Sequence, residues 1–191
     1  MTQDRARGAA RRYFVSHKKR TGRGRAPRTD TARKARARAK KSTAPVAIHW
    51  QGVAPFAPDS KVRSAVRAAR KLGRREDLGL SVVFVSDARL ARLHAQHMGD
   101  PTHTDVITFD LDDELGGPGG EIYVSAPCAR RTARARGVDA RRELCLYVVH
   151  GVLHLCGYDD HAREDRARMR VAEARVMRAS GWNDDPNPHD A

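Results

Sequence analysis

Residues 139–156 limit the fold of this chain more than any other segment. Large apolar side chains recur on nearly every side of the helix that this segment predicts: Leu144, Leu146, Val148, Val149, Val152, Leu153 and Leu155. A helix on a protein surface shows one apolar stripe, whereas a helix that is apolar all round is stable only when other elements cover it. The segment therefore predicts a buried central helix.

The elements expected around this helix are short. Alternation and β-branched runs predict four strands, at 46–50, 80–85, 105–111 and 121–125. Helical spacing, caps and glycine stops predict five helices: one capped by Asp59 and ending at Gly73, one capped by Ser86, and those at 127–137, 139–156 and 162–179. We expect a single α+β domain over 43–182, with a small mixed four-stranded sheet around the central helix.

The positive charge of the chain is concentrated in residues 1–42. This segment holds 16 of the 37 Lys and Arg residues and only two acidic ones, Asp4 and Asp30. It has too few large apolar residues to offset the entropy of ordering, so we expect a disordered basic tail, with a second, polar tail at 183–191. Such a tail commonly binds nucleic acid by neutralising phosphates; a solubilising extension or an organellar transit peptide are the alternatives.

Nothing in the sequence predicts a membrane span or an export signal. The three cysteines, Cys128, Cys145 and Cys156, are an odd number, which is typical of buried thiols in a reducing compartment. We therefore expect a cytoplasmic protein with no membrane partner.

His150 and His154 are four residues apart on the central helix. Their rings therefore project from one face, one turn apart, which is the geometry by which two imidazoles bind one zinc ion. A buried imidazole without a partner costs roughly 1–3 kcal/mol. Gly157 should end the helix in a left-handed conformation and return the chain, so that Asp160 or His161 reaches the same ion. Three protein ligands with an open fourth position are typical of catalytic zinc; core histidines capped by an acidic turn are the alternative.

Gly151 narrows the chemistry of this site. A zincin metalloprotease has its general base, a Glu, directly after the first histidine, and here that position is Gly151. A metal that polarises water or a phosphoryl oxygen supports phosphodiester hydrolysis with less help from a protein base. The basic tail points to a polyanion, and RNA is the expected substrate.

Three segments are similar to hallmarks of the YbeY endoribonuclease family, the bacterial ribosomal RNA maturation factors. They are His150-Gly-Val-Leu-His-Leu-Cys-Gly-Tyr-Asp159, Thr104-Asp-Val-Ile-Thr-Phe109 and Gly120-Glu-Ile-Tyr-Val-Ser125. The resemblance covers roughly 45–182. It implies a single-strand-specific, metal-dependent endoribonuclease in ribosomal RNA maturation and ribosome quality control, with one zinc ion per chain held by three side chains. The implied partners are ribosomal RNA and the small ribosomal subunit.

The chain departs from the family pattern at the third ligand. The usual histidine, ten residues after the first, is replaced by Asp160, and His161 follows it. On spacing, Asp160 is the ligand; with a one-residue bulge in the turn, His161 takes its place. The expected metal residues are therefore His150, His154 and either Asp160 or His161, and the expected catalytic residues are His150, His154 and Asp160.

A second departure concerns phosphate contacts. Many relatives have an Arg six residues before the Thr of the Thr-Asp-Val element, where this chain has Met98. His97 and His103 are the candidate replacements. Two residues at the beginning of the strand, Thr104 and Asp105, complete the expected substrate-binding set, although Asp105 is equally typical of a turn cap.

Two other functions remain in consideration. One is a zinc metallopeptidase-like hydrolase, which Gly151 argues against. The other is a non-catalytic ribosome-assembly factor with a structural metal, which the open fourth ligand position argues against.

Overall fold

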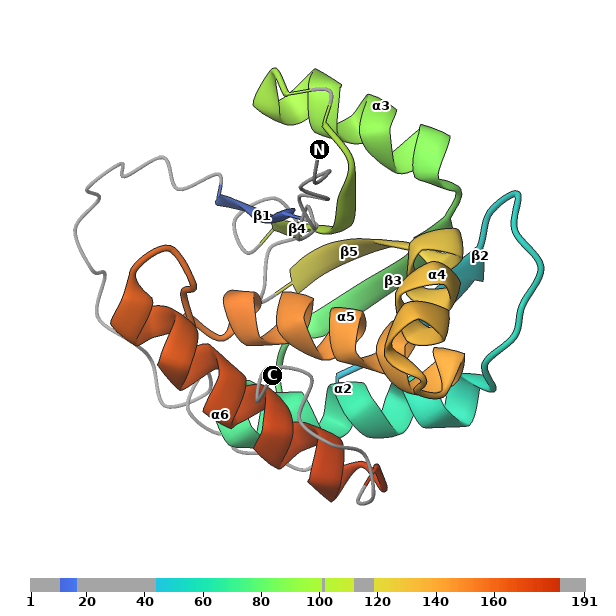
Figure 1. Ribbon diagram of the computed structural model, residues 1–191. Helices are drawn as coiled ribbons and strands as arrows, with labels where there is room; N and C mark the ends of the chain where they lie inside the picture. The colour runs from blue at the N-terminus through green and yellow to red at the C-terminus, as the bar shows by residue number, and fades with distance from the viewer. Residues whose placement is uncertain (1–10, 17–43, 101, 112–118, 183–191) are drawn as a thin grey trace, which may run out of the picture.

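The computed structural model describes residues 11–16, 44–100, 102–111 and 119–182 (Figure 1). Its strands form one mixed sheet in the order β1-β4-β5-β3-β2. The strand bounds are β1 Arg11–Ser16, β2 Val46–Trp50, β3 Gly79–Val85, β4 Thr104–Asp110 and β5 Gly119–Ser125. Strands β4 and β5 pair antiparallel, whereas the other neighbours pair parallel. The predicted α+β class and the four predicted strands are confirmed.

Strand β1 is an addition to the predicted sheet. It pairs in parallel with β4, with Tyr13 opposite Ile107 and Ser16 opposite Asp110. Residues 11–16 lie inside the segment expected to be a disordered tail, so for these six residues the expectation was wrong. Tyr13, Phe14 and Val15 are the β-prone apolar run of an otherwise basic segment, and β4 provides the strand with which this run pairs. The remainder of that tail and the tail at 183–191 lie outside the described residues.

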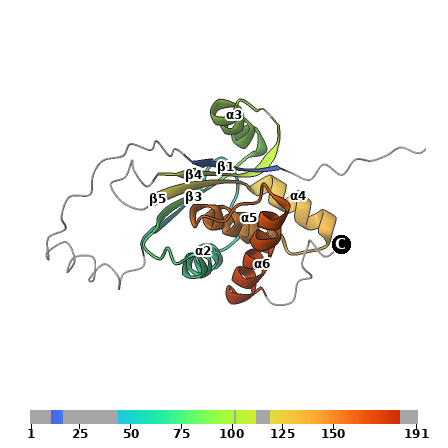
Figure 2. The ribbon, with the colours of Figure 1, turned by 90° about the vertical axis from the view of Figure 1, so that its left-hand side faces the viewer.

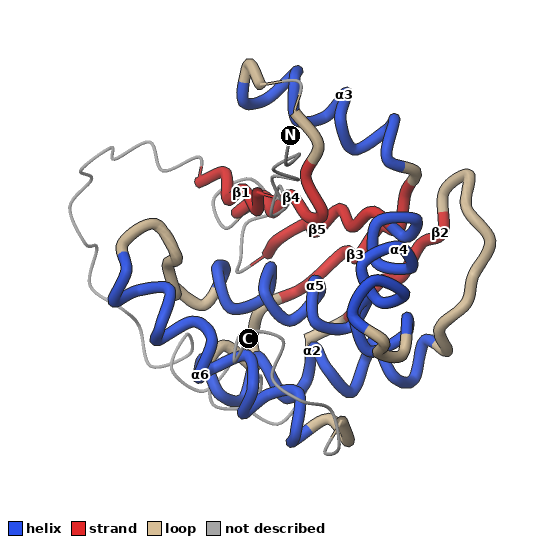
Figure 3. Tube along the Cα trace, viewed as in Figure 1, coloured by secondary structure: helices blue, strands red, loops and turns tan. Residues whose placement is uncertain are grey.

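The five helices of the described residues divide unequally between the two faces of the sheet. Helix α3, Asp87–Met98, covers one face, and the other four cover the opposite face: α2 Asp59–Gly73, α4 Ala126–Arg136, α5 Ala140–Leu155 and α6 Arg163–Ala179 (Figures 1, 2 and 3). The larger apolar core lies on the four-helix side, and a small one lies under α3 around Leu90 and Ile107. No helix among the described segments is long and apolar enough to cross a membrane.

Capping residues account for most helix beginnings. The side chains of Ser86, Ser125 and Asp139 each accept a backbone N–H from the first turn of α3, α4 and α5, as N-caps do. The expectation that Asp59 caps α2 was wrong by one residue. Pro58 is the N-cap, and Asp59 lies in the first turn, where its charge favours the positive end of the helix dipole.

Helix α5 is the buried centre of the domain, as predicted. Every residue from Arg142 to Leu155 is buried. Gly151 allows the helix to lie close to the sheet, because a Cβ at this position would stand 2.8 Å from Thr108 Oγ1 and 2.9 Å from Ile122 Cγ2. Position 151 therefore faces β4 and β5 at a distance that leaves no room for a side chain.

Candidate metal centre

The centre begins at the turn that ends α5. Gly157, at φ +92°, donates its N–H to His154 O at 2.9 Å, and Tyr158 donates to Leu153 O at 3.0 Å. This pair of bonds is the Schellman arrangement, which glycine favours because it adopts a positive φ without strain. The turn sends the chain back past the end of the helix, where His154 lies in the last turn and His150 lies one turn before it.

His150 and His154 converge through their Nε2 atoms. They are 1% and 4% exposed, and the two Nε2 atoms are 2.8 Å apart. Each Nδ1 faces an oxygen: Glu173 Oε1 at 2.7 Å from His150, and Tyr158 O at 3.0 Å from His154. Because a carbonyl or carboxylate oxygen only accepts, each ring, when it is neutral, carries its proton on Nδ1. The Nε2 lone pairs therefore point at each other.

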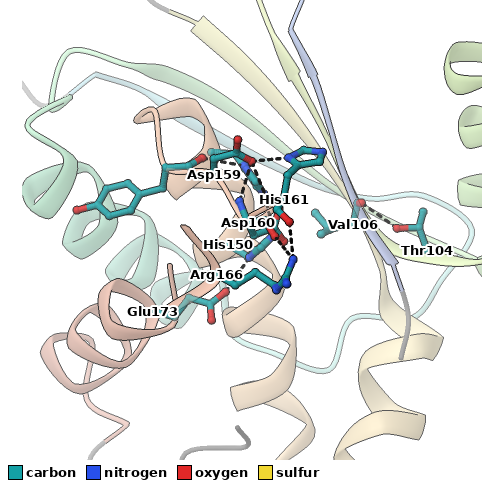
Figure 4. A network of polar contacts seen from close by, with 10 residues as sticks. Thr104, Val106, His150, Asp159, Asp160, His161, Arg166 and Glu173 are labelled. Carbon is teal, nitrogen blue, oxygen red and sulfur yellow. Dashed lines mark hydrogen bonds and ion pairs between the residues drawn. The ribbon is translucent and has the colours of Figure 1, made fainter. Parts of the chain in front are cut away.

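Asp160 adds a third electron-rich group. Its Oδ2 lies 3.6 Å from His150 Nε2, and its Oδ1 lies 3.6 Å from His154 Nε2 (Figure 4). One ligand atom from each of the three residues lies within 4.8 Å of the others. Two lone pairs and a carboxylate repel one another unless a cation lies between them, and histidines that bind metal usually donate their other ring N–H to such partners. The residues present fit a metal ion.

Burial favours the neutral form of His154. Desolvation lowers its pKa, and the opposing attraction of Asp160 and the bond to the Tyr158 carbonyl do not reverse that shift. A neutral imidazole is the form that binds a metal.

His161 turns away from this cluster. Its side chain is 79% exposed, and its Nδ1 lies 2.5 Å from Asp159 Oδ1. This hydrogen bond and the charge of Asp159 raise the pKa of His161, and the same bond is the largest cause that lowers the pKa of Asp159 to about 2. Asp159, Asp160 and His161 form a second candidate metal group, because one ligand atom from each lies within 4.8 Å of the others, but this group is mostly exposed. The structure thus places Asp160 toward the histidines and His161 toward Asp159.

Helix α6 supplies two supporting residues that the sequence analysis missed. Glu173 is buried, and its carboxylate is hydrogen-bonded to His150 Nδ1 (Figure 4). Arg166 donates through Nη1 to two carbonyls of the turn, His161 O at 2.5 Å and Asp160 O at 3.2 Å. Glu173 carried a detectable signal, because it falls on the apolar stripe of α6 between Met169 and Val176. A carboxylate on a buried stripe needs a partner, and His150 is that partner.

The four expected substrate residues lie elsewhere. None of them belongs to either candidate metal group found among the described residues. Thr104 and Asp105 are buried at the beginning of β4, where Thr104 Oγ1 donates to Val106 O at 3.1 Å. His97 lies on α3, its ring 4.9 Å from that of Phe109. His103 is exposed.

Comparison with known proteins points to one family. The family model for Endoribonuclease YbeY matches residues 51–181. Proteins named Endoribonuclease YbeY from Heliobacterium modesticaldum and Pelotomaculum thermopropionicum are 36% and 35% identical, over 56% and 60% of this chain and 72% and 80% of theirs. The one from Protochlamydia amoebophila is 39% identical over 51% of this chain and 67% of its own. The solution structure of TM1509 from Thermotoga maritima aligns with a TM-score of 0.49 at 24% identity, over 76% of this chain and 99% of that one.

Proposed function

Because the chain belongs to the Endoribonuclease YbeY family, we propose that it is a metal-dependent endoribonuclease that cleaves single-stranded RNA. Its role is the maturation of ribosomal RNA and the quality control of ribosomes, on the small ribosomal subunit and in the cytoplasm. The observation that carries the proposal is the convergence of His150, His154 and Asp160 at the end of the buried helix α5.

We propose zinc as the metal, one ion per chain. His150 and His154 provide the two nitrogens and Asp160 the oxygen, a donor set that zinc accepts, and three protein ligands leave a fourth position for water or substrate. When bound, such an ion polarises a phosphoryl oxygen or lowers the pKa of water. The preference for Asp160 over His161 rests on the two 3.6 Å distances from its carboxylate and on the contact of His161 with Asp159.

The chain's own groups prepare the centre. Glu173 and the Tyr158 carbonyl keep the ring protons on Nδ1 and fix the ring planes, so the Nε2 lone pairs stay aimed at one point. Burial of both rings keeps bulk water off the helix side of the centre.

The geometry at position 151 argues against the peptidase alternative. A metalloprotease of the zincin type needs a glutamate there as its base. A Cβ at Gly151 would stand under 3.0 Å from side-chain atoms of Thr108 and Ile122, so no such side chain fits unless these two residues shift. The base for hydrolysis of a peptide is therefore missing from its usual position.

The test is cleavage of RNA by the purified full chain. We expect single-stranded RNA to be cut internally, duplex RNA of the same sequence to be spared, and a chelator to stop the reaction until metal is restored. His154→Ala, expressed and purified identically, controls for contaminating nucleases. Cleavage that persists equally in the chelator and in His154→Ala would refute the proposal.

We further propose that the basic segment tethers RNA. Residues 17–42 hold twelve Lys and Arg residues against one Asp. Removal of 1–42 is a poor test, since it also deletes strand β1. Replacing the twelve basic residues with Gln leaves β1 in place. We expect weaker binding to single strands and a log–log salt slope that falls by about 0.7 per lost phosphate contact. An unchanged slope would leave the segment as a solubilising or targeting extension.

A further inference from the structure

A cavity of about 190 Å³ lies between α2 and the beginning of β2 and contains none of the residues of the metal centre. Its lining consists of Ala44, Pro45, Val46, Arg63, Arg67, Arg70 and Glu76. The volume is smaller than that of the roughly 300–1,000 Å³ pockets that hold drug-sized ligands. The cavity therefore suits a single small group rather than a cofactor.

Three arginines on one face of α2 give the cavity its chemistry. Arg63, Arg67 and Arg70 follow the i, i+4, i+7 spacing that aligns side chains along a helix. Arg63 donates to Val46 O at 2.6 Å, and Arg70 donates to Ala44 O at 2.8 Å and to Pro45 O at 3.1 Å. These bonds hold the first residues of the β2 segment against α2, and they go to neutral carbonyl groups.

Among the residues that the structure describes, no carboxylate is in contact with the guanidinium of Arg70. The side chain is 4% exposed, and its Nε has no hydrogen-bond partner in the described part of the chain. Burial lowers the pKa of Arg70, against the smaller raising effects of Cys156 and Asp77. Buried charges are normally paired, because an unpaired one loses its hydration and gains no attractive interaction that offsets the loss. Among the lining residues only Glu76 is acidic, against three arginines.

We propose that this cavity binds a phosphate group, and that the phosphate belongs to the backbone of single-stranded RNA. Guanidinium groups bind phosphate oxygens with two parallel hydrogen bonds, which is why arginine is preferred at phosphate sites. The assignment to RNA rests on the proposed function, while the assignment to phosphate rests on the arginines alone. The cavity would hold the strand at a point outside the metal centre.

Arg67 is the residue through which the proposal is tested. It is exposed, lines the cavity, and makes no ion pair with any residue that the structure describes, whereas Arg63 and Arg70 hold the β2 segment. Arg67→Ala therefore removes a phosphate donor without releasing β2. Lys71→Ala is the matched control: it removes the same charge one turn further along α2, from an exposed residue outside the lining.

The experiment measures two ligands on the full, metal-loaded chain. In the first arm, thermal unfolding is compared in inorganic phosphate and in chloride at equal ionic strength. A ligand that binds the native state raises the unfolding temperature with its concentration. We expect the phosphate-specific increase to shrink markedly in Arg67→Ala and to persist in Lys71→Ala. Phosphate bound at the metal centre contributes equally to all three proteins and cancels.

In the second arm, binding of a single-stranded RNA is followed by fluorescence anisotropy as a function of salt. Loss of one phosphate contact reduces the log–log salt slope by about 0.7. A reduced slope in Arg67→Ala beyond that of Lys71→Ala supports the RNA backbone as the source. If Arg67→Ala loses the phosphate-specific rise in unfolding temperature but keeps the wild-type salt slope of RNA binding, the RNA assignment is overturned and free phosphate is the ligand.

Equal phosphate increments in the wild type and both variants would overturn the proposal altogether. Cleavage at the metal centre is scored separately through His154→Ala. An absence of RNA cleavage together with a lost phosphate increment in Arg67→Ala would remove the proposed function and leave the phosphate cavity standing.

Discussion

The two halves of the candidate metal centre are built in opposite ways. His150 and His154 lie inside a buried helix, and each ring is held by an oxygen on its far nitrogen. Asp160 and His161 lie on a short turn, where Asp160 is partly buried and His161 is exposed beside Asp159. In the helix, the backbone places both rings on one face, and the two oxygens fix their orientation. In the turn, a shift of the chain by one residue would bring His161 instead of Asp160 toward the histidines. The contacts that hold the turn therefore determine which side chain faces them.

The largest effect is expected in the buried half. The wild type should bind one zinc-class ion per chain. Either His150→Ala or His154→Ala should abolish stoichiometric binding, because the two ligands that remain in each variant cannot hold the ion without the lost nitrogen. Elemental analysis of dialysed protein measures this. His49→Ala, which removes an exposed histidine of β2, is the control and should keep the full content. Undiminished metal in the two site variants would place the ion elsewhere.

In the exposed half, we expect Asp160 to be a zinc ligand and His161 not to be one. Asp160→Ala should lower zinc affinity by more than the roughly 10–100-fold typical of residues that only support a ligand, and His161→Ala by a few-fold at most. Competition with a chromogenic chelator gives both affinities. The reverse order would mean that the turn rearranges to bring His161 to the ion. Unchanged affinity in both variants would exclude both residues as ligands.

A supporting residue of the buried half should matter next. Glu173→Ala should reduce zinc affinity about 10–100-fold, because His150 loses the acceptor that fixes its proton and orientation. Glu173→Gln should lose less, since an amide oxygen also accepts the Nδ1 proton. Glu164→Ala, in the exposed first turn of the same helix, is the control. If the alanine and glutamine variants both bind zinc as tightly as the wild type, Glu173 does not position His150.

The smallest effect is expected from the support of the exposed half. Arg166 holds the turn through the carbonyls of Asp160 and His161, but its side chain is exposed, and water and salt weaken such bonds. Arg166→Ala should lower zinc affinity only about threefold to tenfold. The neighbouring Arg168→Ala, which breaks an exposed pair with Asp165, should not change it. A loss as large as that of Glu173→Ala would show that the turn depends on Arg166 as much as the helix depends on Glu173.

Local patterns predicted most of the fold because each depends on neighbours in sequence. The Ser86 cap, the glycine turn at Gly157 and the apolar surroundings of His150 are properties of short segments. Strand β1 was missed because its stability comes from pairing with β4, nearly a hundred residues away, rather than from its own basic surroundings. The cap of α2 was placed one residue too late, at Asp59, because the actual N-cap is Pro58, which has no side chain that can cap.

The site follows the same division. Spacing alone identified His150 and His154, because i and i+4 share a face on any helix. Glu173 and Arg166 reach the centre only through the packing of α6 against α5, which no local pattern contains. His97 and His103 were considered as replacements for the arginine that many relatives have at the position of Met98, and the contact of His97 with Phe109 is a tertiary one that no local pattern contains.

By itself, the sequence determined that this chain has a buried helix bearing two histidines, a glycine turn after it, an α+β domain, and a basic segment in which few acidic residues balance the positive charge. These features follow from periodicity, φ preferences and composition, which are local. Only the tertiary structure decided that Asp160 rather than His161 faces the histidines, that Glu173 fixes a ring, that Gly151 is a packing contact, and that three arginines of α2 meet at one cavity. Each of these depends on which side chains distant segments bring together, and that is set by packing.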